Sequence, residues 1–336
     1  MGLKVLELFG GIAACSKALE NLGIDYEIVD YVEINEHAVK SFNAIHGTDF
    51  TTQDICKWDK DVEVDLVMHG SPCQDFSVVG LGAGGDIGSG TRSSLMYETV
   101  RIVKKLKPKY IVWENVKNLL SKTHRHNFDA YINILKDFGY NSYYKVLNAC
   151  DYGLPQSRER VFTVSIRQDI DDGSFDFPQP ITLETKLQDI VETNVDEEYY
   201  LTDTFKEQIR NTKYRISNYV ESTNKILDGY FDDFKVMDYR YDEGLRIRKH
   251  GLCPTLTTRG KQSISGVPIF LKDNTLRFLT PRESWRLMGF SDEDYDKASQ
   301  VVSSSQLYKQ AGNSIAVNVL MAIFKELFGG DTQWKS

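Results

Sequence analysis

The chain has 336 residues, which is enough for one large domain and a smaller one. A hydrophobic fraction of 41% and a charged fraction of 26% are typical of a soluble protein, and five scattered cysteines without a CxxC pair disfavour a disulfide framework or a zinc site. We therefore expect a cytoplasmic protein with no membrane span and no metal. The net charge of −8 is unevenly spread, because residues 1–100 carry sixteen acidic and six basic side chains, whereas residues 235–286 carry eleven basic and five acidic ones. Such a basic segment suits a face that meets phosphates, although a solvated charged surface is the alternative.

The first half of the chain alternates short β-branched runs with helical patterns. We predict strands at 3–9, 27–33, 64–69, 109–113, 143–149 and 160–167, with helices near 13–22, 35–45, 94–106 and 127–138. This alternation predicts an α/β fold with a doubly wound, mainly parallel sheet. Ligands of such sheets bind at the carboxyl ends of the strands, so the chemistry is expected in the loops that follow them.

The composition and the pattern of predicted elements change near residue 170. An acidic, turn-rich stretch is followed there by a Pro-containing linker, and residues 181–275 lack the βαβ alternation. We predict that 181–275 form a separate, smaller domain and that 276–299 form a hinge. The tail returns to a helical pattern, so we predict a larger domain of 1–177 that is completed by 300–336.

The first predicted strand ends in a glycine turn at Phe9-Gly10-Gly11, and a helix pattern follows. Glycines let a ligand approach the backbone, and a helix N-terminus supplies N–H donors. The second strand ends at Glu33, an acid that suits a bidentate hydrogen bond to a ribose diol. Asp54, further on, suits an adenine amino group. Each feature alone also fits a tight turn or a solvated acid; together they predict an adenosine-containing cofactor.

The third strand runs directly into Pro72-Cys73, which places a thiol in the expected crevice. A thiol is a good nucleophile once its pKa is lowered, although a lone cysteine is more often a small buried hydrophobe. The loop 80–90 that follows contains six glycines, and this composition suits either a lid over the substrate or a plain connector.

Two further strands carry polar side chains at the same predicted crevice. The fourth strand ends in Glu114 and Asn115. Arg158 and Arg160 stand at i and i+2 beside the last strand, which puts them on one face if the segment is extended. Each of these residues alone also fits an ordinary solvent-exposed polar side chain, but their joint position at strand ends predicts a catalytic site.

These motifs resemble, in their order, those of the C5-cytosine methyltransferases. The resemblance rests on Phe9-Gly10-Gly11, Gly70-Ser71-Pro72-Cys73-Gln74, Glu114-Asn115-Val116, Gln156-Ser157-Arg158-Glu159-Arg160, Arg282-Glu283 through Phe290, and Gln310-Ala311-Gly312-Asn313-Ser314. They cover the chain from residue 3 to about 328, with 181–275 outside the motif set. One departure is Ala13-Ala14, where the family usually has a further glycine.

The resemblance implies a Rossmann-like methyltransferase that uses S-adenosylmethionine to methylate C5 of a flipped cytosine in duplex DNA. Cys73 would add to C6, a protonated Glu114 would hold N3, and Arg158 and Arg160 would hold O2 and nearby anionic groups. Asn115 would steady the nucleophile loop. The implied cofactor contacts are Phe9, Gly11, Ile12, Glu33, Ile34, Asp54, Ile55, Pro72, Asn313 and Ser314.

The smaller domain 181–275 holds the place of the target-recognition domain of this family. The DNA contacts expected from the resemblance and from the basic surplus are Gln74, Ser77, Arg92, Asn115, Arg246, Arg248 and Arg259. We expect a monomer on a short DNA site, and a cognate restriction endonuclease is a further expected partner. Two alternatives stay open: a tRNA cytosine-5 methyltransferase, and a catalytically silent DNA-binding relative.

Overall fold

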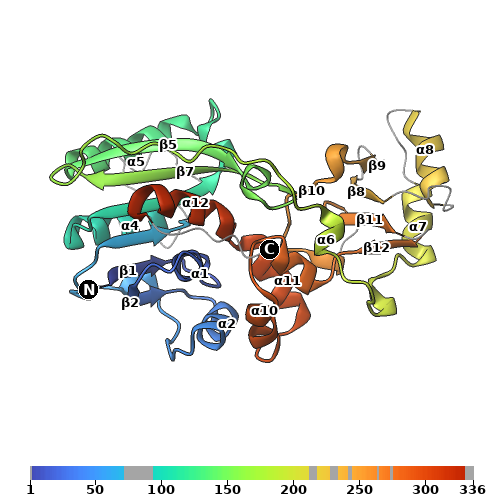
Figure 1. Cartoon of the computed structure of the whole chain (residues 1–336), viewed down its shortest axis with the longest axis horizontal. Coiled ribbons are helices and arrows are strands. Elements are labelled where there is room, and N and C mark those ends of the chain that lie inside the picture. The colour runs from blue at the N-terminus through green and yellow to red at the C-terminus, as the bar shows by residue number, and fades with distance from the viewer. Residues whose placement is uncertain are drawn as a thin grey trace. The chain divides into compact units, whose positions relative to one another are not determined.

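The computed structural model describes residues 2–71, 94–211, 218–227, 234–240, 244–262, 265–272 and 275–329. Within it the chain forms two compact bodies (Figure 1). Unit 1 comprises residues 1–148, 159–180 and 317–336, and unit 2 comprises 149–158 and 181–316. These bounds differ from the expected domains at 149–158 and 300–316, which belong to unit 2. The assignment of one domain to catalysis, another to target recognition and a third segment to a hinge remains a prediction.

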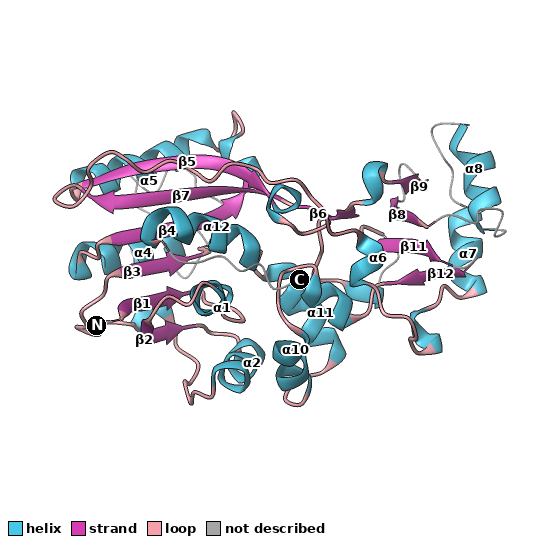
Figure 2. Ribbon diagram, in the orientation of Figure 1, coloured by secondary structure: helices cyan, strands magenta, loops and turns pink. Residues whose placement is uncertain are grey.

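Unit 1 is built on a six-stranded sheet of order β2-β1-β3-β4-β7-β5 (Figure 2). The strands are β1 (Leu3–Leu8), β2 (Tyr26–Val32), β3 (Leu66–His69), β4 (Tyr110–Val116), β5 (Tyr140–Asn148) and β7 (Glu159–Arg167). The pairs β1–β2, β1–β3 and β3–β4 are parallel, whereas β7 is antiparallel to both β4 and β5. The predicted α/β fold with a mainly parallel sheet is therefore confirmed.

The described helices of unit 1 connect or cover these strands. They are α1 (Ala14–Asn21), α2 (Glu36–His46), α4 (Ser94–Leu106), α5 (Arg125–Asp137) and α12 (Val317–Phe328), with the short 3-10 helices η1 (Ile55–Lys57) and η2 (Lys117–Leu120). Helix α2 is capped at both ends by its own sequence. The Asn35 side chain accepts hydrogen bonds from two N–H groups of the first turn, and Gly47 ends the helix in a left-handed conformation.

Helix α12 returns the tail of the chain to unit 1. It contacts α1, where Asn21 meets the Met321 sulfur at 3.8 Å. By length and composition alone, the stretch Ser304–Phe328 is apolar enough to cross a membrane. This stretch contains two helices, however, and Leu320, Ile323 and Phe324 of α12 are fully buried. Such burial is what a core helix of a soluble protein shows.

Unit 2 contains a four-stranded antiparallel sheet of order β12-β11-β8-β9. Its strands are β8 (Lys235–Arg240), β9 (Gly244–Ile247), β11 (Pro268–Lys272) and β12 (Thr275–Phe278); a separate parallel pair joins β6 (Gln156–Ser157) to β10 (Cys253–Pro254). The helices are α6 (Leu187–Ile190), α7 (Asp203–Arg210), α8 (Asn218–Leu227), α9 (Pro281–Arg286), α10 (Asp292–Ser299) and α11 (Ser304–Asn313), with the 3-10 helices η3 (Ala149–Tyr152), η4 (Glu197–Tyr199), η5 (Lys249–Gly251) and η6 (Gly260–Gln262). One face of the sheet packs its apolar side chains, among them Met237, Tyr239 and Ile269, against Ile209 of α7 and Ile226 of α8.

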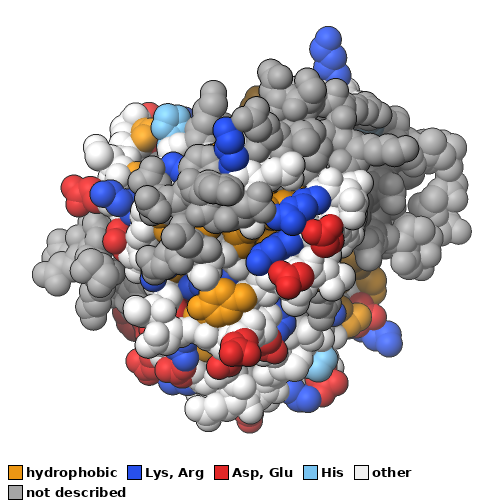
Figure 3. Space-filling model, turned by 90° about the vertical axis from the view of Figure 1, so that its right-hand side faces the viewer, with side chains coloured by type: hydrophobic (Ala, Val, Ile, Leu, Met, Phe, Trp, Pro, Cys, Tyr) orange, Lys and Arg blue, Asp and Glu red, His pale blue; other side chains and the backbone are white. Residues whose placement is uncertain are grey.

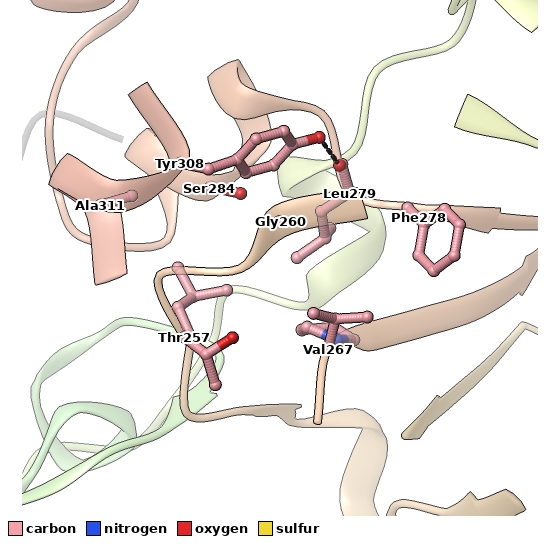
Figure 4. Close-up of a pocket in the computed structure, with 10 residues that line it drawn as sticks. Thr257, Gly260, Val267, Phe278, Leu279, Ser284, Tyr308 and Ala311 are labelled. Atoms are coloured by element: carbon pink, nitrogen blue, oxygen red, sulfur yellow. Dashed lines mark hydrogen bonds between the residues drawn. The ribbon is translucent and has the colours of Figure 1, made fainter. Parts of the chain in front are cut away.

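A small apolar pocket lies within unit 2 (Figure 4). It is lined by Leu256, Thr257, Gly260, Val267, Pro268, Phe278, Leu279, Ser284, Tyr308 and Ala311. The Tyr308 hydroxyl donates to the Leu279 carbonyl, and a Cβ on Gly312 would lie 2.6 Å from the Thr257 carbonyl, so α11 approaches the 257–260 segment as closely as glycine permits. The pocket is lined by packing residues and includes no residue of the expected catalytic or cofactor sites.

Candidate functional site

The turn between β1 and α1 has an unusual backbone. Phe9, Gly11 and Ala13 all have positive φ values, of 54°, 57° and 77°. The Tyr31 hydroxyl donates to the Gly11 carbonyl at 2.6 Å, and a Cβ on Gly10 would lie 2.6 Å from the Tyr31 ring, so the turn is packed tightly on that side. Around Gly11 itself a Cβ would meet nothing within 4 Å. The turn therefore combines a fixed backbone with open space for a ligand.

The left-handed φ of Ala13 explains why a glycine is favoured in this turn, but not why this chain carries an alanine. A left-handed conformation costs an L-residue about 1–2 kcal/mol, whereas glycine adopts it readily. A glycine is thus the usual choice at this end of the turn. In this chain Ala13 is fully buried beside Tyr31, Val39 and Phe42, which gives its methyl group a packing role.

Glu33 follows β2 and joins this turn to the next loop. Its carboxylate accepts hydrogen bonds from the Gly11 N–H at 3.2 Å and the Asn35 N–H at 2.8 Å. Burial raises the pKa of the Glu33 carboxyl, and the backbone N–H donors act in the opposite direction. Ile34, the next residue, is 71% exposed, so a large apolar side chain stands beside the carboxylate.

The loop before η1 lies against the end of β2. The Gln53 N–H donates to the Glu33 carbonyl at 2.9 Å, which brings Asp54 and Ile55 beside Glu33. Asp54 is half-buried and its carboxylate accepts from the Cys56 N–H at 3.0 Å, while Ile55 is buried. Unit 1 thus gathers Gly11 and Glu33, together with Ile12 and Phe9 of the turn, at the ends of β1 and β2, with Asp54 in the loop beside Glu33.

Glu114 and Arg160 form an ion pair on the neighbouring strands β4 and β7. The Arg160 Nε lies 3.0 Å from Glu114 Oε1, and both side chains are mostly buried. Glu114 is opposite Phe162 in the sheet and Arg160 is opposite Val116, so the two charged side chains are diagonal neighbours on one face. A guanidinium this close favours the ionised form of a carboxyl group.

Asn115 reaches the start of the segment that carries the expected nucleophile. Its Nδ2 donates to the Ser71 carbonyl at 2.9 Å, and its Oδ1 accepts from the Val116 N–H at 2.8 Å. Ser71 is fully buried and lies two residues before Cys73. The amide therefore ties the end of β4 to the chain immediately after β3.

A buried network that the sequence analysis missed holds Ser71 from a second direction. His69 Nδ1 lies 3.2 Å from Ser71 Oγ, and Nε2 lies 2.9 Å from the Tyr131 hydroxyl of α5. The imidazole stacks on the Trp113 ring at 5.6 Å. Burial lowers the pKa of His69 to about 3, so the ring is neutral and works as a hydrogen-bonding link. Its position within His-Gly-Ser-Pro-Cys was a possible signal, whereas nothing in the sequence pointed to Tyr131.

Several expected site residues lie outside the described part of the chain. They are Pro72, Cys73, Gln74, Ser77 and Arg92, and the glycine loop 80–90 lies there too. Their roles therefore remain predictions.

Arg158 does not share a strand with Arg160. β6 ends at Ser157 and β7 begins at Glu159, so the extended segment that the i, i+2 spacing presupposes is interrupted at Arg158. Its side chain is buried in unit 2, where Nη2 donates to the carbonyls of Gly312 at 3.1 Å and Ser314 at 2.7 Å. Arg158 thus fixes the backbone around Asn313 and Ser314, two expected cofactor residues; a contact of its own with the substrate remains a prediction.

The candidate DNA-reading arginines lie in unit 2. Arg246 is in β9, Arg248 follows it, and both reach the carboxylate of Asp238 in β8. Arg259 is exposed, with Nη1 3.5 Å from the Ser265 carbonyl. On the face shown in Figure 3, Lys and Arg side chains lie beside Asp and Glu side chains, so basic and acidic groups are interspersed there.

Residues 3–329 match the family described as C-5 cytosine-specific DNA methylase. The chain is 41% identical to the type II methyltransferase M2.ScrFI of Lactococcus lactis subsp. cremoris over 79% of this chain and 67% of the relative. It is 31% identical to the orphan methyltransferase M.SPRI of Bacillus phage SPR, covering 97% of both chains, and 31% identical to the type II methyltransferase M.HhaI of Haemophilus parahaemolyticus, covering 96% and 93%.

Solved structures agree on the fold. A Spodoptera frugiperda DNMT2 variant matches with a TM-score of 0.72 at 22% identity, covering 97% of this chain and 99% of that one. A protein described as a putative DNA modification methyltransferase from an E. coli prophage matches with a TM-score of 0.67 at 20% identity, covering 97% and 98%. The family match spans nearly the whole chain, and the relatives with 31% identity are covered over 97% and 93% of their own length. The chain therefore belongs to the C-5 cytosine-specific DNA methylase family and is a DNA cytosine-5 methyltransferase.

Proposed function

We propose that this methyltransferase acts on C5 of a flipped cytosine in a short specific duplex site, through a covalent bond between Cys73 and C6 of the base. The observation that carries this proposal is the group of side chains around the ends of β3 and β4. Asn115 holds the Ser71 carbonyl, and the Glu114–Arg160 ion pair lies on the same strand ends. A base inside a duplex is inaccessible to such a site, so the cytosine has to leave the stack.

The cofactor of this proposal is S-adenosylmethionine, and the residues at the β1 and β2 ends fit an adenosine group. Glu33 offers a carboxylate for the ribose diol, Ile34 an apolar surface for the adenine, and Asp54 an acceptor for the adenine amino group. The open side of Gly11 leaves room for the ligand beside the backbone. When bound, S-adenosylmethionine supplies an electrophilic methyl group. From the resemblance, Asn313 and Ser314 of unit 2 are further expected cofactor contacts, and Arg158 holds the backbone around them.

The chemical task of the protein side chains is to make C5 nucleophilic. Cytosine C5 is a poor nucleophile because the ring is aromatic. When the Cys73 thiolate forms a bond to C6, an electron pair moves through the ring toward C5 and N3, and Glu114 holds N3 by a hydrogen bond. C5 would take the methyl group as the sulfonium S–CH3 bond breaks and a neutral thioether leaves; a base would then remove the C5 proton, the Sγ–C6 bond would break and the thiolate would leave.

The ion pair bears on the protonation of Glu114. A hydrogen bond donated to N3 needs a protonated carboxyl, but the Arg160 guanidinium at 3.0 Å stabilises the carboxylate. We infer that Glu114 is protonated when the base is bound, with the Arg160 guanidinium holding the base O2. The same low-dielectric site would then favour the neutral acid.

A DNA substrate would explain the excess of basic residues in 235–286, because their positive charges could neutralise its phosphates. Lys and Arg side chains that neutralise phosphates supply sequence-independent affinity, and base contacts supply specificity. The relatives include both type II and orphan methyltransferases, so a cognate restriction endonuclease remains a prediction for this chain.

A methyl-transfer assay with a matched pair of cysteine variants tests the proposal. Cys73→Ser should abolish transfer of tritiated methyl groups to duplex DNA while calorimetry shows unchanged cofactor binding. Cys56→Ser, which alters an exposed cysteine of unit 1, should keep full activity. Substantial transfer by Cys73→Ser would refute the covalent route.

A further inference from the structure

Asp238 is a buried carboxylate that two partly exposed arginines share. Its side chain is 4% exposed, and it contacts the guanidinium of Arg246 and, at 2.6 Å, Nε of Arg248. Asp238 and Arg246 are directly opposite each other in the β8–β9 ladder, and the Arg248 N–H donates to the Val236 carbonyl at 2.7 Å. The three charged groups thus occupy one fixed place at the edge of the sheet.

This cluster lies on the face of the sheet that is turned away from the apolar core. Met237 and Tyr239, the neighbours of Asp238 in β8, point into that core together with Leu245 of β9. Because side chains alternate along a strand, Asp238 and Arg246 point to the opposite face. Val236 and Phe270, which share this second face, are also buried, so Asp238 lies in a covered place outside the apolar cluster of Met237 and Tyr239.

A second arginine–acid pair in unit 2 shows what a purely structural pair looks like. Arg277 and Glu283 are 4% and 0% exposed, and Arg277 donates to Glu283 at 2.6 and 2.9 Å and also to the Phe278 and Glu192 carbonyls. Arg246 and Arg248, by contrast, are 23% and 35% exposed. Asp238 is 4% exposed and therefore nearly as buried as Glu283, yet the arginines it pairs with reach the solvent.

We propose that Asp238 is a positioning residue that presents Arg246 and Arg248 for the recognition of guanine in the major groove. Arginine recognises guanine through a bidentate contact to O6 and N7, and such a contact needs a fixed guanidinium plane. Arg248 pairs with the carboxylate through Nε, 2.6 Å from Oδ1, and its terminal nitrogens carry four N–H donors. Because the two long side chains are already immobilised in the free protein, they lose less conformational entropy when DNA binds.

The charge of the cluster also favours a base edge over a phosphate. One carboxylate cancels one of the two guanidinium charges, which weakens attraction to a phosphate and leaves the directional N–H donors in place. Phosphate contacts fix the register of a protein on DNA, whereas base-edge contacts carry the sequence information. The inference rests on the proposed DNA substrate and names the residue that sets specificity within it.

Methylation of a randomised duplex library, read by bisulfite sequencing, tests the inference. The wild-type protein should give a motif with at least one guanine beside the methylated cytosine. Arg246→Lys and Arg248→Lys keep the positive charge but lose the two parallel N–H donors of the guanidinium group. Each should therefore reduce the preference for guanine over the other bases at particular positions by about ten-fold or more. Asp238→Asn should relax the same positions and leave cofactor affinity unchanged.

Arg240→Lys is the matched control. Arg240 lies in β8 on the same face as Asp238, is exposed, and should keep the wild-type motif. Thermal unfolding shows whether Asp238→Asn folds. If it does not fold, the motifs of the two lysine variants test the inference instead. A uniform loss of methylation at every position, or an unchanged motif in both lysine variants, overturns the inference. If the wild type methylates nothing, the proposed function fails, and the same library selected by binding still tests the guanine preference.

Discussion

Replacing Glu7 with glutamine should make the protein more stable at high pH. Glu7 lies in β1, is fully buried, and accepts hydrogen bonds from the Ser16 N–H at 3.1 Å and from the Ser16 hydroxyl. It thereby anchors α1 just after the glycine turn of the expected cofactor site. Burial raises the pKa of the Glu7 carboxyl from 4.5 to about 7, against the smaller effect of the two hydrogen bonds.

The magnitude follows from linkage between protonation and folding. The folded protein holds the Glu7 proton more tightly than the unfolded chain, so its contribution to stability is full below pH 4.5 and is lost as the pH rises through 7. At about 1.4 kcal/mol for each pKa unit, ionisation of Glu7 costs about 3 kcal/mol of folding free energy above pH 8. Glutamine removes this cost, and its side-chain oxygen can still accept from the Ser16 N–H.

Denaturant unfolding at pH 5 and pH 8 measures this difference. Glu7→Gln should exceed the wild type by about 3 kcal/mol at pH 8 and by much less at pH 5. Glu27→Gln, which removes an exposed carboxylate from β2, is the control and should match the wild type at both pH values. An equal stability of Glu7→Gln and wild type at pH 8, or the same difference at both pH values, would refute the reasoning.

Two more predictions concern the candidate site. Glu33→Ala should weaken S-adenosylmethionine binding by about 1.5–3 kcal/mol, the value for a hydrogen bond to a charged group; unchanged affinity in calorimetry would make Glu33 a structural acid that only holds Gly11 and Asn35. His69→Phe keeps an aromatic ring beside Trp113 but loses the hydrogen bonds to Ser71 and Tyr131, so it should slow adduct formation with the target base about ten-fold or more at unchanged cofactor affinity. A wild-type rate of adduct formation would show that the network does not position the nucleophile.

The sheet of unit 1 was readable from the sequence because buried strands appear as apolar runs. The predicted strands 3–9, 64–69 and 160–167 lie within two residues of the observed bounds. Strand direction is not encoded in such runs, so the antiparallel pairing of β7 with β4 and β5 was not visible. The bounds of unit 2 were also hidden, because β6 joins β10 through residues about a hundred positions apart.

The sequence predicted the closeness of two expected site segments, because the parallel strands β1 and β2 end at one edge of the sheet, before Phe9 and Glu33. Asp54 follows no strand; it lies just before η1, beside the hydrogen bond from the Gln53 N–H to the Glu33 carbonyl. Arg158 shows the limit of spacing arguments, since the chain leaves the strand at that residue and buries the guanidinium elsewhere. Partners distant in the chain, such as Tyr131 for His69, leave no local signal in one sequence.

The covalent bond to Cys73 is the central claim, and a fluorine trap tests it most directly. A base bonded to the thiolate must lose its C5 proton before the thiolate can leave, and fluorine at C5 cannot leave as a cation. Duplex DNA with 5-fluorocytosine in the target site should therefore give, with S-adenosylmethionine present, an adduct that survives denaturing electrophoresis. Cys73→Ala should give none, and the same trap in tRNA should stay unbound. The absence of an adduct on DNA that the protein demonstrably methylates would contradict the covalent mechanism.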